Sequence, residues 1–90
     1  MKDPRYKAIK SLIETGSIKT LAEVFTIIPL SLVRNDLKIN YNTLRKKVDR
    51  TELITIKDIM SLASLFEVEP MEVYKLCVFD GIKAKKANKR

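Results

Sequence analysis

Apolar residues recur at the spacing of amphipathic helices along most of this chain, and short polar or proline-containing breaks separate the repeats. The first repeat predicts a helix over residues 5–14, begun at Asp3 and ended at Gly16. The second predicts a helix over residues 18–28 with Ser17 as its N-cap. Their apolar positions are Tyr6, Ile9, Leu12 and Ile13 in the first helix, and Ile18, Leu21, Ala22, Phe25 and Ile28 in the second.

The chain must then bend at Pro29, because a proline ring clashes with a preceding helical turn. A short third helix is predicted over residues 30–37, with its apolar side facing the interior. A break over residues 38–40 separates it from a basic fourth helix. Two short helices joined in this way are typical of a helix-turn-helix.

The fourth helix opens at Tyr41, with Asn40 placed to cap it, and runs to residue 48 or 50. Leu44 and Val48 lie four residues apart and so point to the same, inner side. The side chains left facing outward are Tyr41, Asn42, Arg45, Lys46 and Asp49. Amide, guanidinium and ammonium groups on one exposed helical face are the chemistry that reads base edges in a DNA major groove. The simpler alternative is a solvated basic face.

The last two repeats predict a fifth helix over residues 56–66 and a sixth that starts near Pro70. Thr55 and Asp58 form a capping-box pair at the start of the fifth. The sixth helix is apolar nearly all the way round, which suggests that one of its faces contacts something beyond the core. Residues 83–90 are basic, carry no apolar residue larger than alanine, and are predicted to form a disordered tail.

Together these elements predict an all-α fold, a compact bundle of five to six helices in a single domain over residues 1–82, of which 1–16 form an extra N-terminal helix. A chain of 90 residues that is 46% hydrophobic can bury one modest core without disulfides or metal. No segment approaches the roughly 18 apolar residues of a membrane span, and the N-terminus does not resemble a signal peptide. We therefore expect a cytoplasmic protein with no membrane partner.

Composition argues against catalysis. The chain has no histidine, so the commonest general base and metal ligand is missing, and its one cysteine cannot build a thiolate metal site. No glycine-rich phosphate loop is present either. We expect no enzymatic activity, no metal, no cofactor and no small-molecule ligand.

Charge is distributed unevenly along the chain. Residues 34–50 carry a net charge of +4, whereas residues 51–82 carry −4 and the tail carries +5. The positive end of the domain therefore coincides with the proposed recognition helix. This polarity favours one docking orientation on a phosphate backbone.

Residues 17–76 resemble the helix-turn-helix domain of phage repressors and Cro, the XRE type, with a lambda-repressor-like fold. The resemblance rests on the spacing of Leu44 and Val48 around three basic residues, and on the helix pair that follows. In that pair the matching positions are Thr55, Asp58, Ile59, Leu62, Ala63, Leu65 or Phe66, Val68, Pro70 and Val73. The chain departs from the family at Arg34, Lys38 and Arg50. Lys38 replaces a glycine, and a lysine adopts the left-handed conformation at a cost of about 1 kcal/mol or more.

The resemblance implies sequence-specific binding of double-stranded DNA by a small transcriptional regulator. The residues expected to read bases are Tyr41, Asn42, Arg45 and Lys46. Those expected to contact the DNA backbone are Arg34, Lys38, Asn40, Lys47 and Arg50. The alternative is a protein-interaction module that keeps the fold without reading DNA, and Leu30, Arg34 and Lys38 make it credible because they depart from the family.

The second apolar face of the sixth helix leaves two interpretations open. In the first, this face forms the interface of a homodimer through Tyr74, Cys77, Val78 and Phe79. In the second, the extra N-terminal helix covers this face within one chain. For the basic tail, a DNA-neutralising arm and a merely solubilising end are both reasonable.

Overall fold

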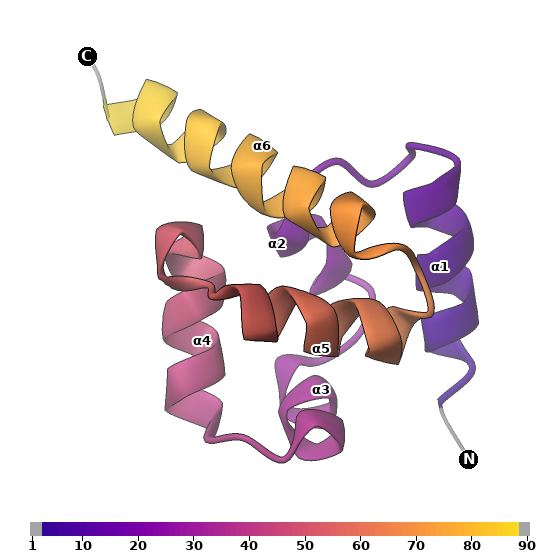
Figure 1. The fold of residues 1–90 in the computed structure, drawn as a ribbon. Helices are drawn as coiled ribbons and strands as arrows, with labels where there is room; N and C mark the ends of the chain where they lie inside the picture. Colours follow the sequence, from indigo (N-terminus) through magenta and orange to yellow (C-terminus); the bar gives the residue numbers. More distant parts are fainter. Residues whose placement is uncertain (1–2, 89–90) are drawn as a thin grey trace.

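The computed structural model of this chain describes the backbone of residues 3–88 and the side chains of residues 3–79. All regular structure in that part of the chain is helical (Figure 1). In chain order the elements are α1 (Arg5–Glu14), α2 (Leu21–Val24), α3 (Leu30–Leu37), α4 (Tyr41–Asp49), the 3-10 turn η1 (Thr51–Leu53), α5 (Ile56–Phe66) and α6 (Pro70–Asn88). The predicted all-α fold class is confirmed.

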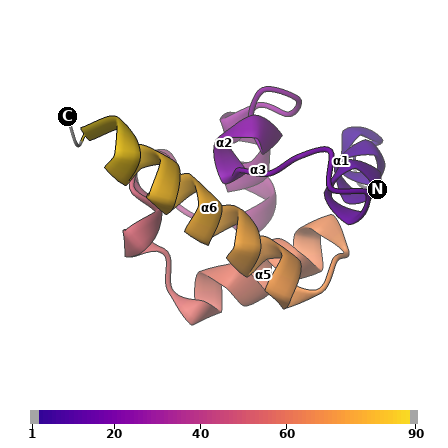
Figure 2. The same ribbon diagram turned by 90° about the horizontal axis from the view of Figure 1, so that it is seen from above.

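Helix α5 lies at the centre of the fold and packs most extensively on α6. In Figure 1, α4 and α1 flank opposite ends of α5, whereas α3 lies below it and α6 crosses above it. Seen from above in Figure 2, α1 again lies far from the C-terminal end of α6. The proposed recognition helix α4 and the extra N-terminal helix therefore lie on opposite sides of the molecule.

One continuous core joins the helices. Its buried apolar side chains are Tyr6, Ile9, Ile13, Ile18, Leu21, Val24, Ile28, Val33, Leu44, Leu62, Ala63, Phe66, Val73, Leu76 and Cys77. Phe66 is the largest fully buried side chain, with 1% of its surface exposed, and its ring centroid lies 6.1 Å from that of Tyr6. This aromatic pair joins α1 to α5.

The second helix is much shorter than predicted. The sequence suggested helix from residue 18 to 28 with Ser17 as its cap, but α2 spans only Leu21–Val24 and Thr20 is its N-cap. Ile18 is buried all the same, because the connection from α1 carries it into the core. Ile18, Leu21 and Ile28 are therefore core as expected, but Ala22 is exposed and Val24 is buried in its place, because the segment is not one continuous helix.

A capping box explains where α2 starts. The Thr20 hydroxyl accepts a hydrogen bond from the Glu23 backbone N–H at 3.3 Å, and the Glu23 carboxylate accepts from the Thr20 N–H at 3.0 Å. This reciprocal arrangement satisfies N–H groups that a helix start leaves unpaired. After Val24 the backbone continues in tighter turns, in which the Thr26 and Ile27 N–H groups donate to carbonyls three residues before them, at 3.2 and 3.1 Å. The Thr26 hydroxyl also donates to the Glu23 carbonyl at 2.7 Å.

The extra N-terminal helix is fixed to the helix-turn-helix by a polar contact as well as by packing. The Tyr6 hydroxyl donates a hydrogen bond of 2.6 Å to the Asp36 carboxylate near the end of α3. Gly16, with φ of 77°, takes the left-handed conformation predicted for the end of the first helix. Helix α1 is thus an integral part of the domain.

Helix α6 continues further than the sequence suggested. Its backbone is helical to Asn88, whereas residues 83–90 were predicted to be disordered. The expectation is therefore wrong for residues 83–88, and residues 89–90 lie outside the described part of the chain. The physical reason is that alanine and lysine are good helix formers and that adding residues to an existing helix avoids the unfavourable nucleation step.

Two helices end at a residue other than glycine in the left-handed conformation. Lys38 closes α3 and Glu67 closes α5, each with φ of 59° and ψ of 45°. After Lys38, the Ile39 N–H donates to the Arg34 carbonyl at 3.1 Å, so the usual hydrogen bonds of such a cap are formed. The left-handed conformation expected at Lys38 is confirmed, and the steric strain of its Cβ lowers the stability of the folded state.

Replacing Lys38 with glycine is expected to stabilise the fold by about 1 kcal/mol, raising Tm by roughly 4–8 °C, because glycine has no Cβ to clash. Thermal unfolding followed by circular dichroism measures this shift. Lys46→Gly is the matched control, since Lys46 lies in regular helix and glycine there is expected to cost about 1 kcal/mol. A Lys38→Gly protein that melts below the parent would contradict the assigned conformation.

Candidate nucleic-acid interface

Helices α3 and α4 and the connection between them form the candidate interface. Asn40 caps α4 as predicted, and its side-chain carbonyl accepts hydrogen bonds from the backbone N–H groups of Asn42 at 2.8 Å and Thr43 at 3.3 Å. Ile39, in the connection, is half-buried against the core. The start of α4 is therefore fixed both by capping and by packing.

Leu44 and Val48 anchor α4 to the body of the protein. Leu44 has 4% of its surface exposed and Val48 is half-buried, which confirms the inward side predicted from their spacing. Asn42, Arg45 and Lys46 are exposed on the rest of the helix. Three of the four side chains proposed as base readers are thus exposed on a helix whose opposite side is fixed in the core.

Arg45 has one acidic neighbour on its own helix. Its Nε lies 3.9 Å from Asp49 Oδ2, and the two side chains are 64% and 66% exposed. Exposed ion pairs of this kind are worth about 0–1 kcal/mol, because solvent screens the charges and ordering two side chains is unfavourable. The guanidinium therefore stays available to a stronger partner such as a guanine edge or a phosphate.

Tyr41 differs from the other proposed base readers because its side chain is half-buried. It borders a shallow depression shared with α3, whose lining also includes Ser31, Arg34 and Asn35. Ser31 was not predicted from the sequence, although its position three residues before Arg34 on the same helix would have indicated it. The structure thus joins the start of α4 and the exposed side of α3 into one surface, to which Leu32 and Tyr41 add apolar area.

The residues proposed for the DNA backbone separate into two groups. Lys38 and Arg50 are exposed, and Arg50 lies 3.5 Å from the exposed Glu52. Lys47 differs, because its Nζ donates a hydrogen bond of 2.7 Å to Asp58 and only 25% of its side chain is exposed. Lys47 therefore links α4 to α5 and is less accessible than Lys38 and Arg50, and its contact with the DNA backbone stays a prediction.

Asp58 is the acidic partner in this link. Its carboxylate also accepts a hydrogen bond from the Thr55 backbone N–H at 3.0 Å, completing the capping box predicted for α5. Partial burial raises the pKa of Asp58, but the hydrogen bonds from Lys47 and Thr55 together outweigh burial. The net pKa lies below the ordinary aspartate value.

Asp58→Asn is expected to destabilise the fold by about 1–2 kcal/mol at neutral pH, since the ion pair and part of the cap are lost. Because the pKa of Asp58 is lowered in the folded state, its carboxylate stabilises the fold at pH values above the unfolded-state pKa of about 3.9. This stabilisation is lost as the pH falls through the folded-state pKa. The difference in the free energy of unfolding between the variant and the parent should therefore be smaller under acid conditions. Urea unfolding at neutral pH and at about pH 3 measures it. An equal difference at both would contradict the ion pair.

The residues proposed for a dimer interface are placed unequally. Cys77 is only 7% exposed, and its backbone carbonyl accepts a hydrogen bond from the Thr51 hydroxyl at 3.1 Å. Its assignment to the interface is wrong, because it packs in the core of its own chain. Tyr74, Val78 and Phe79 remain exposed, by 51%, 40% and 47%. The alternative that the N-terminal helix covers them is wrong as well.

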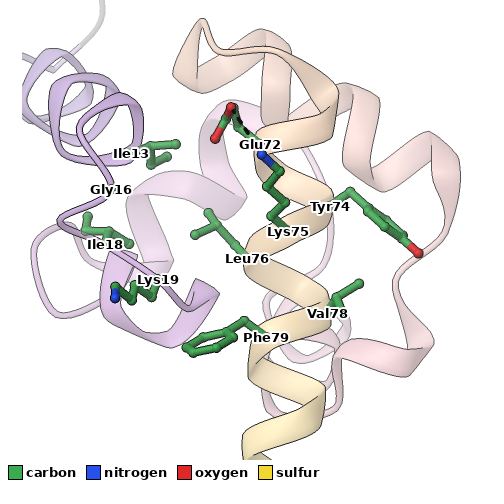
Figure 3. A pocket seen from close by; sticks show the side chains of 10 residues that line it. All are labelled: Ile13, Gly16, Ile18, Lys19, Glu72, Tyr74, Lys75, Leu76, Val78 and Phe79. Carbon is green, nitrogen blue, oxygen red and sulfur yellow. Dashed lines mark ion pairs between the residues drawn. The ribbon is translucent and has the colours of Figure 1, made fainter.

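Figure 3 shows how these residues border an open groove beside α6. Phe79 and Leu76 face Ile18 from the connection after α1, whereas Tyr74 and Val78 point toward the other side of α6. Glu72 and Lys75 add a weak ion pair of 4.0 Å on the same helix. Exposed apolar side chains therefore lie on two sides of α6, with Phe79 at the groove and Tyr74 and Val78 away from it.

The chain matches no protein-family model, and comparisons with curated proteins and with solved structures give no significant match. Within residues 3–88, no helix combines the length and the apolar content that crossing a membrane requires. Among the described side chains, no cluster of three or more His, Cys, Asp or Glu is placed to hold a metal ion.

Proposed function

We propose that this chain binds double-stranded DNA in a sequence-specific manner and acts as a small transcriptional regulator of the phage-repressor helix-turn-helix type. The observation that carries the proposal is α4, a capped helix whose inner side is anchored by Leu44 and Val48 and whose outer side presents Asn42, Arg45 and Lys46. An amide, a guanidinium and an ammonium group match the hydrogen-bonding edges of adenine and guanine in the major groove.

In this proposal the remaining polar residues position the domain on the phosphates. Lys38, Arg34 and Arg50 flank α4, and segment 34–50 carries a net charge of +4. Such contacts supply affinity without sequence preference. Tyr41, at the start of α4, is placed to touch either a base or a phosphate.

Gel retardation of random duplex DNA at about 50 and about 200 mM salt tests the proposal. Strong retardation that falls steeply with salt supports it, and selection of bound duplexes from a random pool then yields the preferred sequence. Absence of retardation at low salt would overturn it. Because the pool is random, the operator sequence emerges from the selection itself.

The salt dependence of binding should separate Arg50 from Lys47. Arg50→Gln is expected to reduce the slope of log affinity against log salt by about 1, because one phosphate contact is lost. Lys47→Gln, the matched control, is expected to leave the slope nearly unchanged, since Lys47 is paired with Asp58. Equal reductions in both variants would contradict the distinction drawn from the structure.

A second candidate function is protein interaction without DNA reading, and the exposed side chains of α6 favour it. Tyr74, Val78 and Phe79 leave an apolar surface uncovered in the described chain. A homodimer formed through the same surface would also be compatible with DNA binding, since it would present two α4 helices. Sedimentation equilibrium of the parent and of a Phe79→Ser variant tests the dimer, and a parent that stays monomeric at high concentration would exclude it.

A further inference from the structure

A cavity of about 460 Å³ lies behind α4, on the side of the helix opposite the proposed base readers. Its walls come from α2, the connection between α3 and α4, the inner side of α4 and the first half of α5. It is more enclosed than the groove beside α6. Cavities of about 300–1,000 Å³ that mix apolar walls with a few polar groups are typical of small-molecule sites.

Five of the apolar lining residues are packed against the core but remain only half-buried, whereas Leu21, Leu44 and Leu62 are fully buried. The half-buried residues are Phe25, Leu37, Ile39, Val48 and Ile54. They belong to different elements, yet they all border the same cavity. Each keeps some apolar surface in contact with water, and removing that surface from water is favourable by roughly 25 cal/mol per Å².

The polar part of the cavity is predominantly cationic. Lys38, Lys47 and Lys57 line it, and Asp58 is the one acidic residue among the described lining residues. Asp58 is already paired with Lys47, whose ammonium has N–H donors beyond the one given to the carboxylate. Within the described part of the chain no ion-pair partner is found for Lys38 or Lys57. The cavity therefore carries an excess of positive charge that an anion would balance.

We propose that this cavity binds a small amphipathic carboxylate. Its apolar chain would lie against Ile39 and Val48, and its carboxylate would accept hydrogen bonds from Lys38 and Lys57. A neutral apolar ligand would leave both ammonium groups without a partner, and an organic cation would be repelled by them. This inference concerns the cavity alone and does not depend on DNA binding.

Titration of the ¹⁵N-labelled chain with octanoate, followed by NMR, tests the proposal. Saturable shifts are expected for the amides of Ile39, Val48 and Leu62, with Kd of about 1 mM or tighter. Octan-1-ol is expected to bind at least about threefold more weakly, because it lacks the charge. Shifts centred on Ile18 and Phe79, or no saturable shifts at all, would overturn the proposal.

Variants identify the binding groups. Ser61→Leu places a larger side chain at the cavity from an exposed position on α5, and it is expected to abolish octanoate binding. Lys57→Gln is expected to weaken binding about three- to fivefold, whereas Lys75→Gln, an equally exposed lysine beside the other groove, should have no effect. Undiminished binding by Ser61→Leu, or equal effects of the two lysine variants, would overturn the assignment. The surface lysine variants keep the test valid if Ser61→Leu unfolds.

Discussion

Replacing Arg45 and Lys46 together with glutamate is expected to abolish sequence discrimination and to lower affinity for a selected duplex at least about 100-fold. Each well-formed contact between a side chain and a base edge is worth about 1–3 kcal/mol, and the new carboxylates would repel the phosphates as well. Both residues are exposed on α4, so the fold itself should be unaffected. Competition gel retardation with selected and scrambled duplexes measures both effects.

The matched control is a Lys7→Glu, Lys19→Glu double variant. It changes the net charge by the same amount, but both lysines are exposed outside α3 and α4, Lys7 on α1 and Lys19 in the connection before α2. It should lower affinity for all duplexes modestly and leave discrimination intact. An unchanged binding site in the Arg45 and Lys46 variant would remove these residues from base reading.

Phe66→Ala is expected to have the largest effect on stability, a loss of about 3–5 kcal/mol. Phe66 is the largest fully buried side chain in the described core and contacts the Tyr6 ring, so alanine would leave a cavity where α1 meets α5. Small domains are stable by only about 5–15 kcal/mol, and the loss would therefore unfold a measurable fraction of molecules. Urea unfolding followed by circular dichroism reports the change.

Phe66→Leu serves as the control, because leucine fills most of the space and should cost about 1 kcal/mol. If both variants lost less than about 1 kcal/mol, the space around Phe66 would have to be hydrated or loosely packed. The large difference expected between alanine and leucine is the signature of a close-packed aromatic contact.

Helix periodicity predicted the positions of most helices because their apolar faces follow the regular spacing that buries them. Leu44 and Val48 illustrate this, as do Thr55 and Asp58, whose capping box was visible from their separation alone. In α2 the same periodicity was misleading. There an apolar stripe fitted a long helix, although Thr20 and Glu23 already marked the true start.

Contacts between distant residues could not be predicted in this way. Lys47 belonged to the basic segment, and only the packing of α4 against α5 revealed its pairing with Asp58. Cys77 was likewise predicted to be part of an apolar surface, but in the structure it is buried in the core of its own chain. Helix α6 is apolar on nearly every side, so periodicity carries no information about which of its residues face inward.

The hydrogen bond between Tyr6 and Asp36 bears on how the protein could be divided. It attaches the N-terminal helix to the end of α3, and the ring of the same tyrosine packs on Phe66. A fragment starting after Gly16 would still contain both helices of the helix-turn-helix, but Asp36 would lose its donor and Phe66 would be open to water. Removing α1 is therefore expected to destabilise α3 and α5 together, so attempts to minimise the chain should shorten it from the other end.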